Sequence, residues 1–254
     1  MKKLSMLGLA AGTLLLAQPV ASAAPRADAA AAVANTAARS PDNVKLDEGR
    51  KPAELLRFFG LQRGMAVGDL FGINLYWSEI MAPAVGPRGS VTIWEPTQFV
   101  NAERSAAFEA FRAKQPNVTM IQSPFEAPNL PRGKFDFVLI NLDYHDVYWM
   151  NEQRHIVRMD PAVLTRAIYA SLKPGGVLGL VDHAGPAGDT RAIVDKLHRI
   201  DPAVVRRDFT RAGFRLEASS SLLRNPADDH SLLVFDPKIR GHTDRFVYKF
   251  RKPR

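Results

Sequence analysis

Seven short apolar stretches, rich in β-branched and aromatic residues, recur along this chain, and segments of helical periodicity alternate with them. The expected strands cover residues 65–70, 90–94, 118–121, 135–140, 176–181, 214–219 and 246–250. The expected helices cover residues 52–59, 76–84 and 103–114, with two more that begin after Asp160-Pro161 and Asp201-Pro202. This alternation is typical of βαβ units, whose strands form a mostly parallel sheet. We therefore expect an α/β fold over residues 42–254.

The last two expected strands differ from the others because no helical pattern separates them. We expect them to pair antiparallel at one edge of the sheet, while right-handed crossovers connect the parallel strands. With 46% hydrophobic and 24% charged side chains among 254 residues, the composition is that of an ordinary globular protein.

The N-terminus has the order of features found in a secretory signal peptide. Lys2 and Lys3 precede an apolar run over residues 6–20, and Ala21-Ser22-Ala23 follows as a cleavage site. The alternative, an uncleaved membrane anchor, needs a longer apolar run than this one. We expect a signal peptide over 1–23, an Ala-rich disordered linker over 24–41, and a periplasmic or secreted product with no membrane span after cleavage.

Charge and cysteine content restrict the possible partners and sites. The formal net charge is +8, but basic and acidic residues are interleaved and no long run of like charge occurs. We therefore expect no nucleic-acid partner. The chain contains no cysteine, which excludes disulfides, thiolate nucleophiles and cysteine-based zinc sites.

Acidic residues stand where the first two expected strands end. Asp69 closes the first strand and Glu95 closes the second. In open α/β sheets, ligands bind outside the carboxyl ends of the strands, and Rossmann-like folds keep an acid near the second position for ribose hydroxyls. A turn of Leu172-Lys173-Pro174-Gly175-Gly176 precedes the fifth strand.

With these features in this order, the chain resembles the class I S-adenosylmethionine (SAM)-dependent methyltransferases. It is most similar to an exported, mostly uncharacterised "predicted methyltransferase" family, through stretches such as Tyr144-His145-Asp146, Asp182-His183 and the tail from Leu223 to Asp229. The resemblance implies a Rossmann-like sandwich with a mostly parallel seven-stranded sheet and an antiparallel edge, and SAM as cofactor. The cofactor-binding positions that it implies are Asp69, Phe71, Gly72, Asn74, Glu95 and Asn141.

The loop after the first strand departs from the family pattern. Phe71, Ile73 and Leu75 occupy the three positions where the family has glycine. Glycine permits positive φ and lets the backbone approach a ligand, whereas branched side chains are poor occupants of that region. Gly72 and Asn74 each lie one residue away from these positions and are the alternative source of backbone freedom in the loop. We expect the loop to take another path and SAM affinity to be weak or lost.

Polar residues cluster where the fourth and fifth strands end. Because these strands are expected to be neighbours, Asp143, His145, Asp182 and His183 should lie together, with Asp146 beside them. Such a group can act as a general base, with His145 the first candidate, because histidine titrates near neutral pH. A divalent metal site and a purely structural role in capping helices and pinning loops are the alternatives. We name Asp143, His145, Asp182 and His183 as catalytic candidates and assign no metal ligand.

Two functions follow from this pattern. The first is an exported SAM-dependent methyltransferase that acts on an unknown small molecule. The second is a methyltransferase-derived binding protein that keeps the fold but has lost or altered the SAM site, since a fold does not by itself imply a function. No feature of the sequence specifies an oligomeric state.

Overall fold

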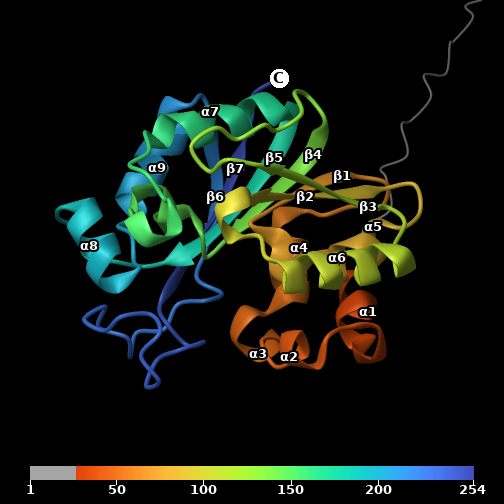
Figure 1. The fold of residues 1–254 in the computed structure, drawn as a ribbon, viewed down its shortest axis with the longest axis horizontal. Coiled ribbons are helices and arrows are strands. Elements are labelled where there is room, and N and C mark those ends of the chain that lie inside the picture. Colours follow the sequence, from red (N-terminus) through yellow and green to blue (C-terminus); the bar gives the residue numbers. More distant parts are fainter. Residues whose placement is uncertain (1–26) are drawn as a thin grey trace, which may run out of the picture.

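The structure is a computed structural model that describes residues 27–254. The expected signal peptide lies outside these residues. Seven strands form one sheet in the order β3-β2-β1-β4-β5-β7-β6 (Figure 1). The strands are β1 (Ala66–Leu70), β2 (Ser90–Pro96), β3 (Val118–Ser123), β4 (Phe135–Asn141), β5 (Leu172–His183), β6 (Arg215–Ser220) and β7 (Arg245–Arg251).

The pairing of the strands agrees with the expected topology. The first five strands pair in parallel, and β7 pairs antiparallel with both β5 and β6. The chain order reverses between β1 and β4, which makes the ends of these two strands the switch point of the sheet. The Lys173-to-Gly176 turn is itself part of β5, because Leu172 already pairs with Phe135.

Helices cover both faces of the sheet. On one face α4 (Pro52–Phe59), α5 (Tyr76–Val85) and α6 (Ala102–Lys114) bury apolar side chains against β1, β2 and β4. On the other face α7 (Pro161–Ser171) and α9 (Pro202–Arg211) pack over β4, β5 and β7 (Figure 1). Asp160 and Asp201 cap α7 and α9, and each precedes a proline at the first helical position, as predicted.

The expected disordered linker is wrong for residues 27–41. Ala29 to Ala34 form α1, whose Ala29 and Ala32 are buried against α4 and α5. Alanine forms helices readily, and its small side chain lets a helix pack closely without a varied core. A short 3-10 helix, η1 (Thr36–Ala38), then leads to α2 (Pro41–Val44) and α3 (Asp47–Arg50). This segment therefore belongs to the folded domain.

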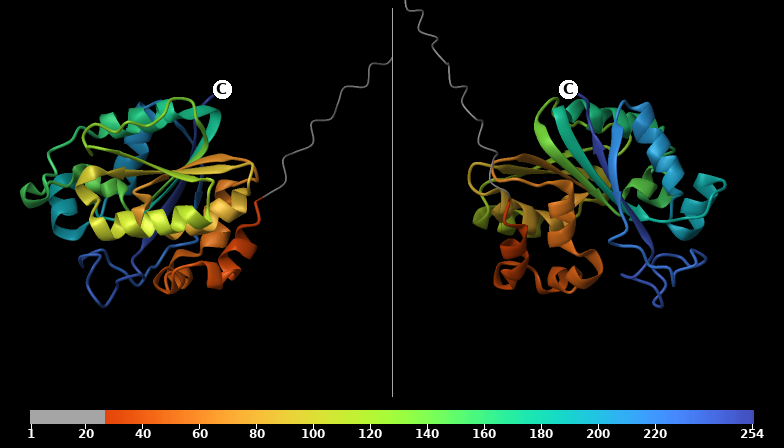
Figure 2. Two further views of the ribbon diagram at one scale, coloured as in Figure 1. Left: turned by 45° about the vertical axis from the view of Figure 1, so that its right-hand side comes forward. Right: turned by 180° about the vertical axis from the view of Figure 1, so that it is seen from behind.

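The N-terminal segment and the long loop between β6 and β7 lie together below the carboxyl ends of the strands (Figure 2). Arg245 donates to the carbonyl oxygen of Gly49 at 2.8 Å, and Lys51 donates to that of Leu222 at 3.1 Å. The loop is held from within by Arg199, which is fully buried and paired with Asp228 at 2.9 Å. Both segments thus close over the edge where ligands bind in α/β sheets.

The helix α8 (Thr190–Leu197) was also not expected from the sequence. It follows β5 and is capped by Asp189, whose carboxylate accepts hydrogen bonds from the backbone of Arg191 and Ala192. Within residues 27–254 the structure contains no helix both long enough and apolar enough to cross a bilayer.

Candidate functional site

The predicted cofactor and catalytic residues stand at the carboxyl ends of four neighbouring strands. Asp69 and Glu95 are the last residues but one of β1 and β2. Asn141 is the last residue of β4, and Asp182 and His183 are the last two residues of β5. Their positions divide them into two groups, one at β1 and β2 and one at β4 and β5.

The loop after β1 keeps two of the backbone conformations that glycine would favour. Phe71 has φ of 59° and Leu75 has φ of 65°, although neither is glycine, while Gly72 to Asn74 form the 3-10 helix η2. Positive φ is thus present at the first and third of the three positions, and the expectation that the loop takes another path stays a prediction. A non-glycine residue in this region costs on the order of 1–3 kcal/mol, so the surrounding packing must hold the loop in place.

Packing around the Phe71 ring explains how that conformation is held. The ring centroid lies 5.2 Å from that of Trp94 and 5.7 Å from that of Phe125, with Phe99 also in contact. Edge-to-face contacts of this kind are favourable beyond the area they bury. Phe71, Trp94, Phe99 and Phe125 thus form one aromatic cluster.

Glu95 follows Trp94 in β2, and its side chain is buried. Its side chain accepts a hydrogen bond from the backbone N–H of Ile73 at 3.1 Å, and the residue is only 2% exposed. Burial raises the pKa of Glu95 to about 8, against the effects of the Ile73 N–H and the Arg104 charge. A carboxylate that binds ribose hydroxyls must be reachable, and this one is not.

Asp69 is also enclosed by its own chain. It accepts a hydrogen bond from the Ser78 hydroxyl at 2.6 Å and is 1% exposed, and burial raises its pKa to about 7. Gly72 packs directly on it, since a Cβ there would come within 2.7 Å of the carboxylate. Asn74 is exposed and accepts through Oδ1 from the Tyr76 backbone. Asp69 and Glu95 are thus both enclosed by their own chain, and a weak or lost affinity for SAM stays a prediction.

The second group is organised around His145 and Asp182. Nδ1 of His145 lies 2.8 Å from Oδ1 of Asp182, so the two side chains are as close as predicted. Asp182 is fully buried, and it also accepts from the backbone N–H groups of His145 and His183. Burial alone lowers the pKa of His145, but the carboxylates of Asp182, Asp146 and Asp143 outweigh it and raise that pKa to about 9.

His183 and Asp143 lie at the same edge but in different surroundings. Nδ1 of His183 contacts the Thr243 hydroxyl at 2.7 Å, and burial and nearby positive charges hold the pKa of His183 well below its usual value. Burial, reinforced by the charge of Asp146, raises the pKa of Asp143 well above its usual value. Asn141 is buried at the last position of β4. The catalytic roles of these residues stay predictions.

The 3-10 helix η4 (Tyr144–Tyr148) carries His145 and Asp146 and is fixed to α9. The hydroxyl of Tyr144 donates to Asp208 at 3.0 Å, and that of Tyr148 donates to the same carboxylate oxygen. Both tyrosines are buried. This double attachment holds the two site residues at a defined distance from β5.

Two residues that the sequence analysis did not single out belong to this region. His198 follows α8 with φ of 49° and brings its imidazole next to His145, with ring centroids 5.5 Å apart. Arg50 ends α3 and lies over the Tyr76 ring at 4.3 Å. No local spacing connects either residue to the strand ends, since the chain folds back to reach them.

A cavity of about 400 Å³ opens beside His145, and the side chains around it include Asp143, Asp146 and His198. A second cavity of about 460 Å³ adjoins it, because both share the walls formed by Leu142, His183, Val234 and Phe235. The accessible space of the site thus lies at the ends of β4 and β5.

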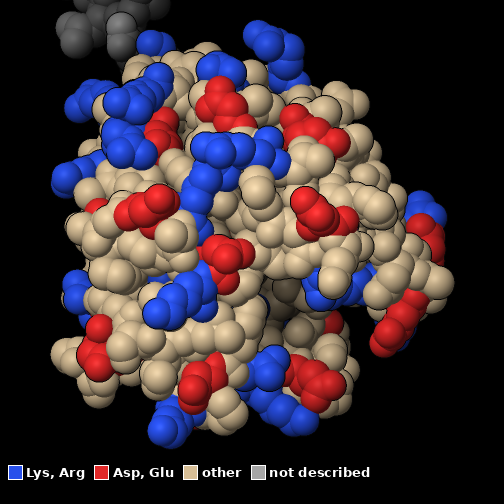
Figure 3. All heavy atoms as spheres, turned by 60° about the vertical axis from the view of Figure 1, so that its left-hand side comes forward, with Lys and Arg blue, Asp and Glu red and all other residues tan. Residues whose placement is uncertain are grey.

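Basic and acidic side chains are interspersed over the face of the molecule drawn in Figure 3.

The sequence has only partial likeness to known proteins. No protein-family model matches the chain. A demethylmenaquinone methyltransferase from Listeria monocytogenes is 27% identical over 133 residues, which are 52% of this chain and 51% of that protein. The chain therefore spans about half the length of the curated relatives it matches.

Solved structures match over most of the chain. A SAM-dependent methyltransferase from Aquifex aeolicus has a TM-score of 0.57 at 17% identity, covering 89% of this chain and 98% of its own. The chain has the class I methyltransferase fold. The [4+2]-cyclase SpnF matches this methyltransferase fold equally well, with a TM-score of 0.57 at 16% identity over 81% of this chain and 80% of its own.

The methyltransferase fold accounts for the sheet order and for the helices on both faces. The expected α/β class, with its mostly parallel seven-stranded sheet and antiparallel edge, is confirmed. The solved relatives include SAM-dependent methyltransferases, so the coarse resemblance is confirmed as well. The likeness to the exported family stays a prediction.

Proposed function

We propose that this protein is an exported small-molecule-binding protein that uses the methyltransferase fold, with its ligand site at the ends of β4 and β5 and its SAM crevice closed. The observation that carries this proposal is the state of Glu95. Its carboxylate is 2% exposed and accepts the Ile73 N–H, while the Phe71 ring of the same loop packs against Trp94. We infer that SAM reaches this carboxylate only if Ile73 moves away from it.

The cavity at the ends of β4 and β5 supports the new position of the ligand site. It combines apolar walls, such as Trp149 and Phe235, with the polar groups of Asp143 and His145. Ligand sites in proteins likewise combine apolar walls with polar groups that fix the orientation of the ligand. The name of SpnF describes a cyclase, so a protein of this fold need not transfer methyl groups.

Methyl transfer is the second candidate function, and a specific observation favours it. Phe71 and Leu75 keep positive φ, which is the backbone shape that a cofactor loop requires. When bound, SAM supplies an electrophilic methyl group on sulfur. His145, oriented by Asp182, would take the proton from an oxygen or nitrogen nucleophile in the cavity once it has lost its own proton, which a pKa of about 9 places in the alkaline range. Positioning of the two reactants would supply most of the remaining rate enhancement.

Calorimetric titration with SAM and with S-adenosylhomocysteine separates the two functions. We expect no binding by the unmodified protein at millimolar ligand. The triple variant Phe71→Gly, Ile73→Gly, Leu75→Gly should gain affinity, because it removes side-chain bulk and restores backbone freedom. The matched triple alanine variant removes the bulk alone.

The outcomes of this titration are distinct. Micromolar binding by the unmodified protein would contradict the proposal and favour the methyltransferase. A gain in the glycine variant but not in the alanine variant would assign the loss of affinity to backbone freedom. No gain in either variant, with both folded by circular dichroism, would show that the loop does not block SAM.

The export part of the proposal rests on Lys2 and Lys3, the apolar run over residues 6–20 and the Ala21-Ser22-Ala23 site. N-terminal sequencing of protein recovered from the native cells tests it. We expect a product that begins at Ala24, found outside the inner membrane. A product that begins at Met1 in the cytoplasm would exclude export.

A further inference from the structure

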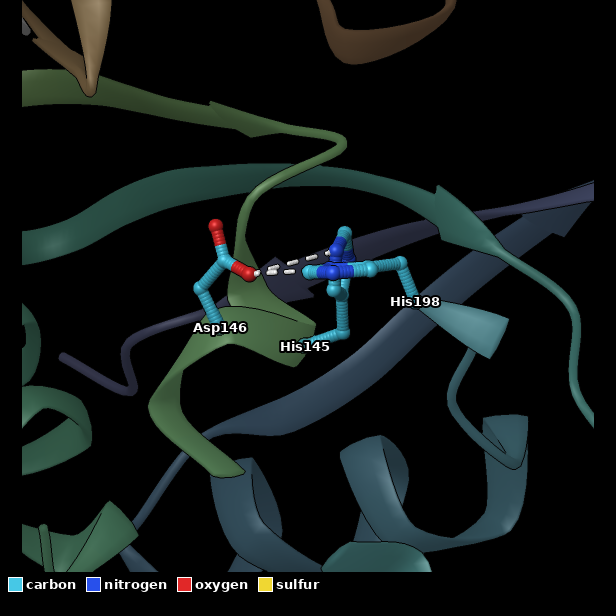
Figure 4. A group of neighbouring side chains, drawn as sticks. All are labelled: His145, Asp146 and His198. Carbon is cyan, nitrogen blue, oxygen red and sulfur yellow. Dashed lines mark ion pairs between the residues drawn. The ribbon is translucent and has the colours of Figure 1, made fainter. Parts of the chain in front are cut away.

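We propose that His145, Asp146 and His198 bind a divalent transition-metal ion, for which Zn²⁺ is the test ion. Figure 4 shows the three side chains directed toward one point, two from η4 and one from the end of α8. Each offers one ligand atom, and these atoms lie within 4.8 Å of one another.

The spacing of the ligand atoms fits a tetrahedral ion. Nε2 of His145 lies 3.4 Å from Oδ1 of Asp146, and Nδ1 of His198 lies 3.5 Å from the same oxygen. Two ligands bound to Zn²⁺ at about 2.0–2.1 Å stand about 3.3–3.4 Å apart at the tetrahedral angle. Two of the three pairs of ligand atoms therefore already have the spacing that the ion requires, and the third pair lies within 4.8 Å.

Oδ1 of Asp146 is a buried acceptor that no hydrogen bond satisfies. Neither imidazole makes a hydrogen bond to it, although both nitrogens face it. A buried carboxylate oxygen that accepts no hydrogen bond is costly, and the two facing imidazoles, at 3.4 and 3.5 Å, compensate it by charge only when they are protonated. A bound cation would supply the missing partner.

The residues behind the ligands hold them in orientation. Asp182 contacts Nδ1 of His145 at 2.8 Å, which leaves Nε2 free to face the proposed ion. Metal-binding histidines commonly have such a carboxylate on the opposite nitrogen, where it fixes the ring and raises its basicity. The His198 ring is held between Trp149 and Phe235, with centroids 5.1 and 5.2 Å away.

The donor set indicates which ions are suited to the site. Two imidazoles and one carboxylate suit Zn²⁺ and other first-row ions such as Fe²⁺, whereas Mg²⁺ and Ca²⁺ prefer oxygen ligands. Three protein ligands leave a coordination position open, as in catalytic rather than structural zinc sites. All three residues border the 400 Å³ cavity, so that position faces the space where a ligand would bind.

The open position also indicates the chemistry of the cavity ligand, a step that rests on the proposed function. A small molecule with an anionic oxygen, such as a carboxylate or phenolate, would complete the coordination of the ion. Arg154 also lines the cavity and adds a positive charge. The metal site itself does not depend on this step.

The competing explanation is that the three side chains only attach η4 to α8. His155 provides a matched control for this explanation. Like His198 it follows a short helix with positive φ, 54° against 49°, but it is exposed and has no ligand atom in the group. Asparagine tolerates this backbone region, so His198→Asn and His155→Asn change the imidazole without new backbone strain.

Calorimetric titration of the purified protein without a histidine tag tests the site, with Zn²⁺ as probe and Mg²⁺ as control. We expect one Zn²⁺ per chain, no Mg²⁺ binding, at least a tenfold loss of Zn²⁺ affinity in His198→Asn and in Asp146→Asn, and no more than a twofold change in His155→Asn. Zn²⁺ should raise the melting temperature of the unmodified protein but not that of His198→Asn.

The visible spectrum of bound Co²⁺ provides a second readout that does not depend on stability, since it reports nitrogen and oxygen ligands at the ion. No Zn²⁺ binding, or equal affinity in His198→Asn and His155→Asn, would overturn the metal site. This result is independent of the SAM titration. Failure of the metal site leaves the proposed function standing, and SAM binding would refute that function while leaving the metal site intact.

Discussion

His145 and Asp182 are joined twice, through Nδ1 at 2.8 Å from one carboxylate oxygen and through the His145 backbone N–H at 2.9 Å from the other. His145 lies in η4, which follows β4, and Asp182 is the last residue but one of β5. This double contact connects the neighbouring strand ends and sets the direction in which Nε2 of His145 points.

The first prediction concerns that contact. Asp182→Asn should lower Zn²⁺ affinity about 10- to 100-fold, because the ring of His145 loses the carboxylate that orients it and raises its basicity. Calorimetry with Zn²⁺ measures the change. Asp160→Asn is the matched control, since asparagine also caps a helix and Asp160 lies outside the site. Equal affinities in the two variants would exclude the positioning role of Asp182.

The second prediction concerns the buried carboxyl of Glu95, whose pKa burial raises from 4.5 to about 8. The folded state then holds the proton more tightly than the unfolded state. Stability from this group is therefore lost as the pH rises from about 4.5 to 8. Glu95→Gln should remove this loss and raise the free energy of unfolding at pH 8 by on the order of 1–3 kcal/mol.

Urea unfolding at pH 5 and pH 8 measures this effect, with the exposed Glu103→Gln as control. Asp69 contributes in the same direction, because its pKa is raised to about 7, so the variant should flatten the pH profile without abolishing it. A pH profile of Glu95→Gln that matches the unmodified protein would show that Glu95 is not buried in its protonated form.

The third prediction concerns Leu75, which has φ of 65° and is buried. Both Leu75→Ala and Leu75→Gly remove the side chain and should destabilise the protein by roughly 2–5 kcal/mol. Glycine should nevertheless be the more stable of the two by about 1 kcal/mol, because it alone adopts positive φ without strain. Chemical denaturation of the two variants gives the order, and the reverse order would mean that the loop is not held in this conformation.

The fourth prediction concerns Arg39, in the segment that the sequence analysis treated as a linker. Its buried guanidinium binds both oxygens of Asp47, at 2.6 and 2.8 Å. Arg39→Ala should cost about 3–5 kcal/mol, since it leaves a partly buried carboxylate without its partner. Lys45→Ala breaks the exposed Lys45–Asp42 pair and should change stability by less than about 1 kcal/mol. Equal melting temperatures would mean that residues 27–41 do not support the domain.

Some features of the site were predictable because they depend on neighbours in sequence and on general rules for parallel sheets. The ends of adjacent strands meet at one edge, so the proximity of His145 and Asp182 followed from their positions after β4 and in β5. The surroundings of the loop after β1 were predictable in part. The loss of glycine was visible in Phe71 and Leu75, but the aromatic contacts around the Phe71 ring were not.

By itself, the sequence determined the seven strands and five of the helices, which are α4, α5, α6, α7 and α9. The caps at Asp160 and Asp201 act over two or three residues, and the strand and helix periods repeat within one element, so both are local properties of the chain. Only the tertiary structure decided that α1 packs on α5, that Glu95 turns inward, and that His198 meets His145 and Asp146. These outcomes depend on side chains far apart in the chain, and close packing of the whole domain selects among them.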